Sequence, residues 1–180
     1  MEQIFMERTI MPSRHIDVGT LRIVGLRRRY PKLEAMRWIG KQWDDFNTAL
    51  REFESPTSAV AYGVCLEGKC DDEIQYLAGI EVDSDFVLPS HFSEVILSPQ
   101  QYAVFAHDGP ASSLPQTWSR IRHSWLPRSS YGLVDAPDLE RYGPGFDPVT
   151  CSGDIQIWVP VKLERVLPDP QNEPVRHRSI

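Results

Sequence analysis

The chain has 180 residues, enough for one domain with a sizeable core and too few for two full domains. Hydrophobic residues make up 41% and charged residues 24%, as in a globular protein, and a net charge of −6 argues against a nucleic-acid-binding surface, which is usually basic. Three irregularly spaced cysteines, scattered histidines and an N-terminus without a long apolar run predict a cytoplasmic protein with reduced thiols, no metal, no cofactor and no membrane segment.

The first half of the chain predicts extended segments around one long helix. The spacing of Ile39, Trp43, Phe46 and Leu50 gives an apolar stripe on a helix over about residues 33–53. Alternating apolar residues predict strands on either side of this helix. These strands are HIDV (15–18), TLRIVGLRRRY (20–30), AYGV (61–64) and IQYLAGIEV (74–82), the first two separated at Gly19-Thr20.

The second half predicts the same order of elements after a loop over residues 82–92. Leu114, Trp118, Ile121 and Trp125 repeat the helical spacing, and Ser113 with Pro115 marks a helix start that ends near Leu126-Pro127. The expected strands are EVIL (94–97), QQYAVFAH (100–107), a segment around RYG (141–143) and IQIWVPVKL (155–163), the first two separated at Ser98-Pro99.

The two halves form a repeat with an offset of about eighty residues, in which IQYLAGIEV matches IQIWVPVKL and AYG matches RYG. We predict an α+β fold in which duplicated strand–helix–strand–strand units form one antiparallel sheet, with both helices on one side. Residues 1–165 are expected to form a single domain with repeats over about 8–82 and 92–163. A proline-rich tail, 166–180, follows.

Several motifs in this order have a familiar spacing. They are YAVFAHDGP (102–110), WLP (125–127), SSYGLVDAPDLERYGPGFDP (129–148) and IQIWVPVK (155–162), with AYGV (61–64) and YLAGIEV (76–82) in the first half. Over roughly residues 8–163 the chain resembles a GyrI-like effector-binding domain, the small-molecule module of AraC-type and MerR-type regulators. The resemblance implies the duplicated fold described above, with a ligand groove between the halves.

Regulators of this type place a DNA-binding region before the domain, whereas here the domain begins close to Met1. We therefore expect a free-standing form, of the kind also carried on integron cassettes, that does not contact DNA directly. The resemblance implies a small hydrophobic or cationic organic ligand. A homodimer and a separate regulatory protein as partner are both left open.

Glu140 is the main candidate for ligand contact. In DLERY (138–142), Glu140 and Tyr142 share one face of a strand, and the pattern leaves open which face points inward. An exposed glutamate paired with Arg141 is the structural alternative, because glutamate is rarely buried. The resemblance implies that Glu140 lies in an aromatic pocket and meets a positive charge on the ligand. In the first repeat Val60 occupies the position that corresponds to Glu140, so the fold itself does not require a carboxylate there.

Three tyrosines are candidates for the pocket walls. Tyr62 and Tyr142 occupy matching places in the repeat, so Tyr62 is expected to face the same groove as Tyr142. Tyr76 begins an inward-facing set on its strand, for which core packing is the alternative. Tyrosine suits a groove because it offers both a ring face and a hydroxyl group.

Three tryptophans on the helix stripes, Trp43, Trp118 and Trp125, complete the candidate site. A cleft between two helices of a duplicated fold is a natural pocket, although aromatic stripes are more often core. Trp158 shares a strand face with Gln156 and Lys162 and is expected to point outward.

We therefore expect a protein that binds small amphipathic cations in an aromatic groove, with Glu140 as the counter-charge, rather than an enzyme. The resemblance also implies a second hypothesis, hydrolysis of cyclopropane-containing electrophiles, with Glu140 and Tyr142 as acid–base groups. A third is a module that binds another protein, such as a regulator or DNA gyrase.

Overall fold

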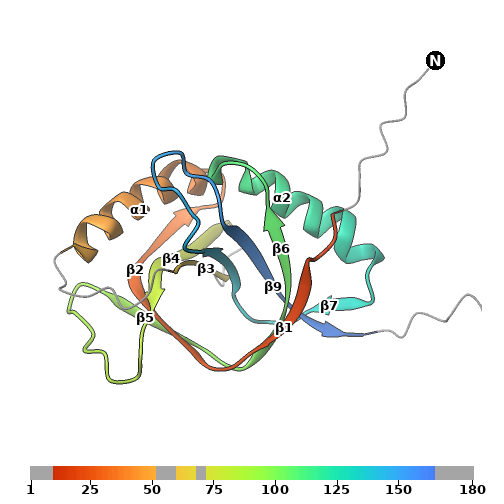
Figure 1. Cartoon of the computed structure of the whole chain (residues 1–180), viewed down its shortest axis with the longest axis horizontal. Helices are drawn as coiled ribbons and strands as arrows, with labels where there is room; N and C mark the ends of the chain where they lie inside the picture. The colour runs from red at the N-terminus through yellow and green to blue at the C-terminus, as the bar shows by residue number, and fades with distance from the viewer. Residues whose placement is uncertain (1–9, 52–59, 68–71, 165–180) are drawn as a thin grey trace, which may run out of the picture.

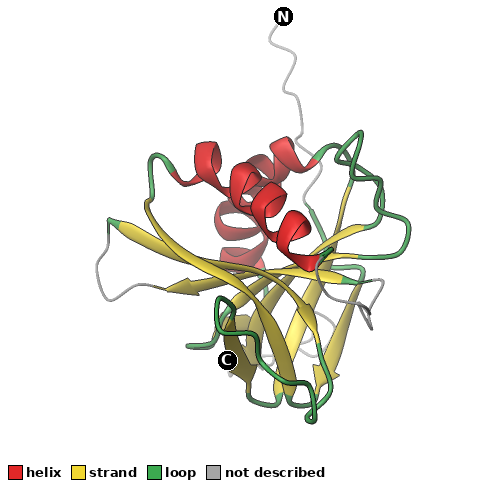
Figure 2. Ribbon diagram, turned by 90° about the vertical axis from the view of Figure 1, so that its left-hand side faces the viewer, coloured by secondary structure: helices red, strands yellow, loops and turns green. Residues whose placement is uncertain are grey.

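The structure is a computed structural model that describes residues 10–51, 60–67 and 72–164. Helices α1 (Ala35–Leu50) and α2 (Leu114–Arg120) lie on the same side of a curled antiparallel sheet (Figures 1 and 2). The strands are β1 (Arg14–Val18), β2 (Leu21–Pro31), β3 (Ala61–Glu67), β4 (Glu73–Glu81), β5 (Ser93–Leu97), β6 (Gln100–His107), β7 (Tyr131–Leu133), β8 (Asp138–Tyr142) and β9 (Ile155–Leu163). The predicted α+β fold is confirmed, whereas the tail, 166–180, lies outside the described residues.

The two halves of the chain exchange their first strands. The sheet order is β1-β6-β9-β8-β3-β4-β2-β5, and β7 pairs with β9. Thus β1 of the first half pairs with β6 of the second, with His15 opposite Ala103, and β5 of the second half pairs with β2 of the first. The breaks predicted at Gly19-Thr20 and Ser98-Pro99 are confirmed, and they separate the strands that go to opposite ends of the sheet.

Both faces of the sheet are buried. On the helix side, Phe46 of α1 and Leu114 of α2 lie in two apolar clusters with strand residues such as Tyr76 and Ile157. On the far side, the curled strands enclose a second core of Ile23, Tyr62, Val64, Leu77, Leu97, Tyr102, Val104, Leu139 and Trp158. Trp158 does point away from the helices, but only 7% of it is exposed, because the curled sheet closes this face as well.

Helix α1 is held on the sheet by a buried glutamine that the apolar pattern did not reveal. Gln42 is fully buried, and its Nε2 donates hydrogen bonds to the carbonyl oxygens of Leu26 (2.8 Å) and Tyr76 (3.0 Å). Its Oε1 accepts a hydrogen bond of 2.9 Å from the hydroxyl group of Tyr30. A buried amide with all these partners fixes the position of α1, and hence of the adjacent Trp43, over the sheet.

The second helical segment is less regular than the single helix predicted over about 113–127. It consists of a 3-10 turn (Ala111–Ser113), α2, a π-helical turn (Ile121–Trp125) and a second 3-10 turn (Leu126–Arg128). Ser113 does not cap the helix through its side chain; its hydroxyl group donates to the carbonyl of Pro110 at 2.7 Å. Within the described part of the chain, no helix has both the length and the apolar character that a bilayer span requires.

Candidate ligand-binding site

Glu140 lies in the middle of the sheet on the face covered by the helices. It is only 8% exposed, and β8 holds it between β3 and β9. Its Oε2 accepts hydrogen bonds from the hydroxyl groups of Tyr76 (2.7 Å) and Tyr142 (3.1 Å). Its Oε1 accepts one from Nε1 of Trp118 at 3.2 Å. The inward face of this strand, which the sequence left open, is therefore the face that carries Glu140 and Tyr142.

Both helices reach the carboxyl group through tryptophan. Trp118 of α2 contacts Glu140 directly, and Trp43 of α1 donates from Nε1 to the hydroxyl oxygen of Tyr76 at 3.1 Å. The Trp43 ring also meets the edge of Tyr142, with centroids 5.1 Å apart. Every side-chain donor that bonds to Glu140 in the described structure is a neutral phenol or indole, so no cationic side chain is hydrogen-bonded to it there.

Burial dominates the electrostatics of this group. Loss of hydration raises the pKa of Glu140, although the hydrogen bonds from Tyr76, Trp118 and Tyr142, and a smaller electrostatic contribution from His107, act in the opposite direction. Burial, reinforced by the nearby Glu140 charge, also raises the pKa of Tyr76 and Tyr142 well above the ordinary tyrosine value. Both phenols therefore remain protonated donors, and Glu140 is a carboxyl group whose ionised form has no cation bonded to it among the described residues.

Gly63 makes the space for this arrangement, and the sequence reasoning missed it. It lies directly opposite Glu140 on β3. A Cβ atom at this position would lie 1.9 Å from the Tyr76 hydroxyl oxygen and 2.9 Å from Glu140 Oε2. The signal was present in AYGV, because a glycine inside a strand pattern often marks a close approach of another group.

A cavity of about 610 Å³ lies next to this network, between the two halves of the chain. Trp43 and Tyr142 belong to its wall, together with Phe46 of α1 and Phe146, whose ring is 4.9 Å from that of Tyr142. Glu140 is not part of the wall. Since Tyr142 both lines the cavity and bonds to Glu140, it separates the carboxyl group from the cavity.

Four of the predicted aromatic residues, Trp43, Tyr76, Trp118 and Tyr142, thus meet at Glu140, and two do not. Tyr62 lies in the core on the far face of the sheet, at 6.2 Å from the Trp158 ring. Trp125 is 4% exposed and packs against Phe105 (4.9 Å) and Tyr131 (6.2 Å) near the end of the helical segment. The structure therefore brings neither of them to the Glu140 network.

The sequence repeat assigned Tyr62 to the wrong face of β3, and the reason is geometric. Ala61 is paired with Tyr142 and Gly63 with Glu140, so it is the odd-numbered residues of β3 that share the inward face. Aligning AYG with RYG shifts the comparison by one residue, and a one-residue shift exchanges the two faces of a strand. The same shift affects Val60, which packs against the far core and is not the counterpart of Glu140.

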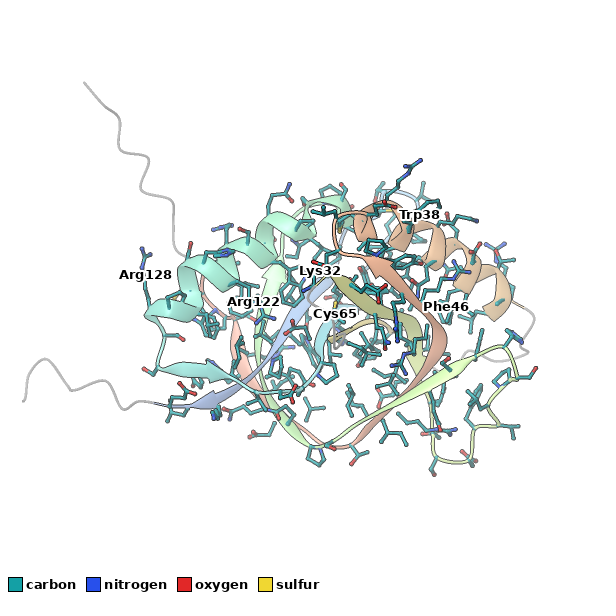
Figure 3. All side chains as sticks on the ribbon, turned by 180° about the vertical axis from the view of Figure 1, so that it is seen from behind. Lys32, Trp38, Phe46, Cys65, Arg122 and Arg128 are labelled. Carbon is teal, nitrogen blue, oxygen red and sulfur yellow. The ribbon has the colours of Figure 1, made fainter. Side chains whose placement is uncertain are left out.

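The α2 side of the network already contains a positive charge. Arg122 forms an ion pair with Asp138, and its guanidinium carbon lies 5.7 Å from the centre of the Trp118 ring. Figure 3 shows Arg122 below α2 and Phe46 below α1, with Cys65 between them in this view.

Within the described residues, no three histidine, cysteine or acidic side chains gather as a metal site would require.

Comparison with known proteins finds a family whose members match most of this chain. Residues 11–162 match the GyrI-like small molecule binding domain. The transcriptional regulator BrlR of Pseudomonas aeruginosa is 26% identical over 125 residues, which span 68% of this chain but only 46% of BrlR.

Two solved structures have the same fold. SAV2435 bound to tetraphenylphosphonium has a TM-score of 0.66 and 19% identity, covering 83% of this chain and 93% of SAV2435. An integron cassette protein from the mobile metagenome of Vibrio cholerae has a TM-score of 0.63 and 15% identity, covering 86% of this chain and all of the cassette protein, 100%.

Proposed function

The chain belongs to the family of GyrI-like small molecule binding domains, and on that premise we propose that it binds small amphipathic organic cations, with Glu140 as the counter-charge. The observation that carries this proposal is the carboxyl group of Glu140, which is almost completely buried and, among the described residues, is bonded by neutral donors alone. Burying an ionised carboxylate without an opposite charge is costly. A ligand cation in the adjacent cavity, separated from Glu140 by the ring of Tyr142, would reduce that cost.

The aromatic side chains around Glu140 favour a cation that is itself apolar. Trp43 and Tyr142 present rings to the cavity, and a well-placed ring attracts a cation by about 0.5–2 kcal/mol. A volume of about 610 Å³ suits a drug-sized molecule. The structural neighbour SAV2435, solved with the lipophilic cation tetraphenylphosphonium, supports the same chemistry.

Phenyl-substituted ligands of different charge test the proposal. Tryptophan fluorescence would be titrated with tetraphenylphosphonium, with the equally shaped anion tetraphenylborate and with neutral triphenylphosphine oxide. We expect the wild-type protein to bind the cation most tightly. Glu140→Gln should weaken the binding of the cation at least about tenfold, equivalent to about 1.4 kcal/mol. It should change the affinity for the neutral ligand little. An equal loss for the cation and the neutral compound would remove Glu140 from charge recognition.

Hydrolysis of a strained electrophile is the second candidate. The observation that favours it is a buried carboxyl group with a raised pKa in contact with two phenols, Tyr76 and Tyr142, a combination that can transfer protons. Product formation from a cyclopropane-containing electrophile, lost in Glu140→Ala, would support catalysis. Tight binding of cations without turnover would support the binding function.

A further inference from the structure

One face of α1 follows the cavity along its length and carries a second carboxylate. The residues Gly40, Trp43, Asp44, Asn47 and Leu50 recur at spacings of three and four, so they lie on one side of the helix, and all of them line the cavity. Asp44 is exposed, which places its carboxylate where the cavity meets solvent. Among the described residues of the wall, none is a lysine, arginine or histidine, and Asp44 is the one with a carboxylate.

The adjacent residue provides a contrast. Asp45 accepts hydrogen bonds from Arg28 at 2.8 Å and from Lys41 at 3.2 Å, and these two cations lower the pKa of its carboxyl group. It does not belong to the cavity wall. In the part of the chain that the structure describes, Asp44 has no such basic partner. The two neighbouring carboxylates therefore differ in one respect that matters for a ligand: the charge of Asp45 is already compensated.

The surroundings of Asp44 leave room for a ligand group. Gly40 lies one helical turn before it, and a Cβ atom added to Gly40 would meet no atom within 4 Å. On the opposite side of Glu140, by contrast, Arg122 covers the Trp118 ring and already occupies Asp138 in an ion pair. Among the described residues of the cavity wall, Asp44 on α1 is therefore the acidic side chain that can meet an additional positive charge on a ligand.

We propose that Asp44 is a specificity-determining residue of this cavity, and that the site favours elongated aromatic dications over monocations. One positive centre is placed at the aromatic layer in front of Glu140, and the second lies beside Asp44 at the entrance. This inference rests on the proposed cation-binding function and adds a class of preferred ligand to it.

Two dyes with a common ring system provide the test. Ethidium and propidium share the phenanthridinium group, and propidium carries an additional quaternary ammonium group on a flexible arm. At low ionic strength, we expect propidium to bind the wild-type protein about threefold to fivefold more tightly than ethidium, as an exposed ion pair would allow. Dissociation constants come from dye fluorescence and tryptophan quenching.

The variants separate a direct contact from a general charge effect. Asp44→Asn should reduce the propidium-to-ethidium ratio to about one, and Gly40→Lys, which places a cation one turn from Asp44 in open space, should do the same. Asp45→Asn removes the same formal charge from the next residue and should preserve the ratio. Glu140→Gln should lower the affinity for both dyes by a similar factor, so it should also preserve the propidium-to-ethidium ratio. Thermal melting verifies that each variant is folded.

Each outcome distinguishes this inference from the function on which it rests. If the wild-type protein binds both dyes with equal affinity, or if Asp45→Asn lowers the ratio as much as Asp44→Asn does, the role of Asp44 is refuted while cation binding stands. If Asp44→Asn leaves the ratio unchanged, the role is refuted as well. If neither dye nor tetraphenylphosphonium binds, the proposed function itself is refuted.

Discussion

The carboxyl group of Glu140 is subject to two opposing effects, loss of water and donation from three neutral groups, and loss of water is the larger. In the free protein, the raised pKa favours the protonated form. Its contribution to stability is complete below the ordinary glutamate pKa of about 4.3 and is lost as the pH rises through the raised value. A bound cation reverses the preference, because it interacts favourably only with the ionised form.

We therefore predict that cation binding strengthens as the pH rises above the ordinary carboxyl range, with release of a proton on binding. Calorimetric titration of tetraphenylphosphonium in two buffers of different ionisation enthalpy measures this proton directly. In Glu140→Gln the proton release and the pH dependence should both disappear. If the variant retained the wild-type pH profile, another group would be responsible.

Gly63 is the second residue on which the network depends. Gly63→Ala would place a methyl group 1.9 Å from the Tyr76 hydroxyl oxygen, so Tyr76 or the strand must shift, which we expect to disturb the bond from Tyr76 to Glu140. We expect a loss of about 1–3 kcal/mol in unfolding free energy and weaker binding of tetraphenylphosphonium. Urea denaturation and fluorescence titration measure the two effects.

Gly19→Ala is the matched control for Gly63→Ala. Gly19 lies in the bend between β1 and β2, and an added Cβ atom would meet nothing within 4 Å. This variant should therefore bind cations as the wild-type protein does. Normal stability and binding in Gly63→Ala would show that Tyr76 can adapt, and that the glycine is not needed for the site.

At the level of the elements, α1 determines the shape of the cavity, and a single buried amide determines where α1 lies. Gln42 connects α1 to β2 and β4 through three hydrogen bonds, while the neighbouring Trp43 and Asp44 face the cavity. The helical segment that follows β6 contributes Trp118 and contains a π-helical turn, a feature often found near functional sites. Each helix thus positions one indole close to Glu140.

We predict that Gln42→Leu weakens the attachment of α1. The substitution keeps an apolar side chain of similar size but leaves the Tyr30 hydroxyl group and the Tyr76 carbonyl without the amide, which costs about 1–3 kcal/mol. Urea denaturation should show this loss, and cation affinity should fall because Trp43 is displaced. Gly40→Ala in the same helix should instead stabilise the protein, by up to about 1 kcal/mol. Unchanged stability in Gln42→Leu would contradict the proposed anchoring role.

For the whole molecule, the exchange of first strands between the halves has a consequence for folding. The first half supplies β1 to the edge of β6, and the second half supplies β5 to the edge of β2. The halves also meet at the centre of the sheet through β3 and β8. Neither half can complete its part of the sheet alone, which supports the prediction of one domain.

We therefore predict a single cooperative unfolding transition for the full chain, monitored by circular dichroism and tryptophan fluorescence. A fragment of residues 92–163 should not fold, because it keeps β9 but lacks β1 beside β6 and β3 beside β8, which leaves one edge of each of these strands unpaired. A dispersed amide spectrum of this fragment by nuclear magnetic resonance would contradict the prediction. Mixing it with the first half is expected to restore structure.

Much of the local structure could be read directly from the residues. The spacing of Ile39, Trp43, Phe46 and Leu50 predicted a helix, and α1 covers these positions. The alternation in IQYLAGIEV and IQIWVPVKL predicted β4 and β9, and the motifs together indicated the family. These properties depend on neighbours along the chain, because helix and strand periods are local.

The composition of the site depended on contacts between distant segments. Glu140 and Tyr142 were found on one strand, but their inward orientation, the exclusion of Tyr62 and the role of Gly63 follow from the pairing of β8 with β3. A strand pattern with period two is compatible with either face, and a shift of one residue exchanges them. Because both faces of this sheet are buried, hydrophobicity could not choose between them, and only the register of the folded sheet did.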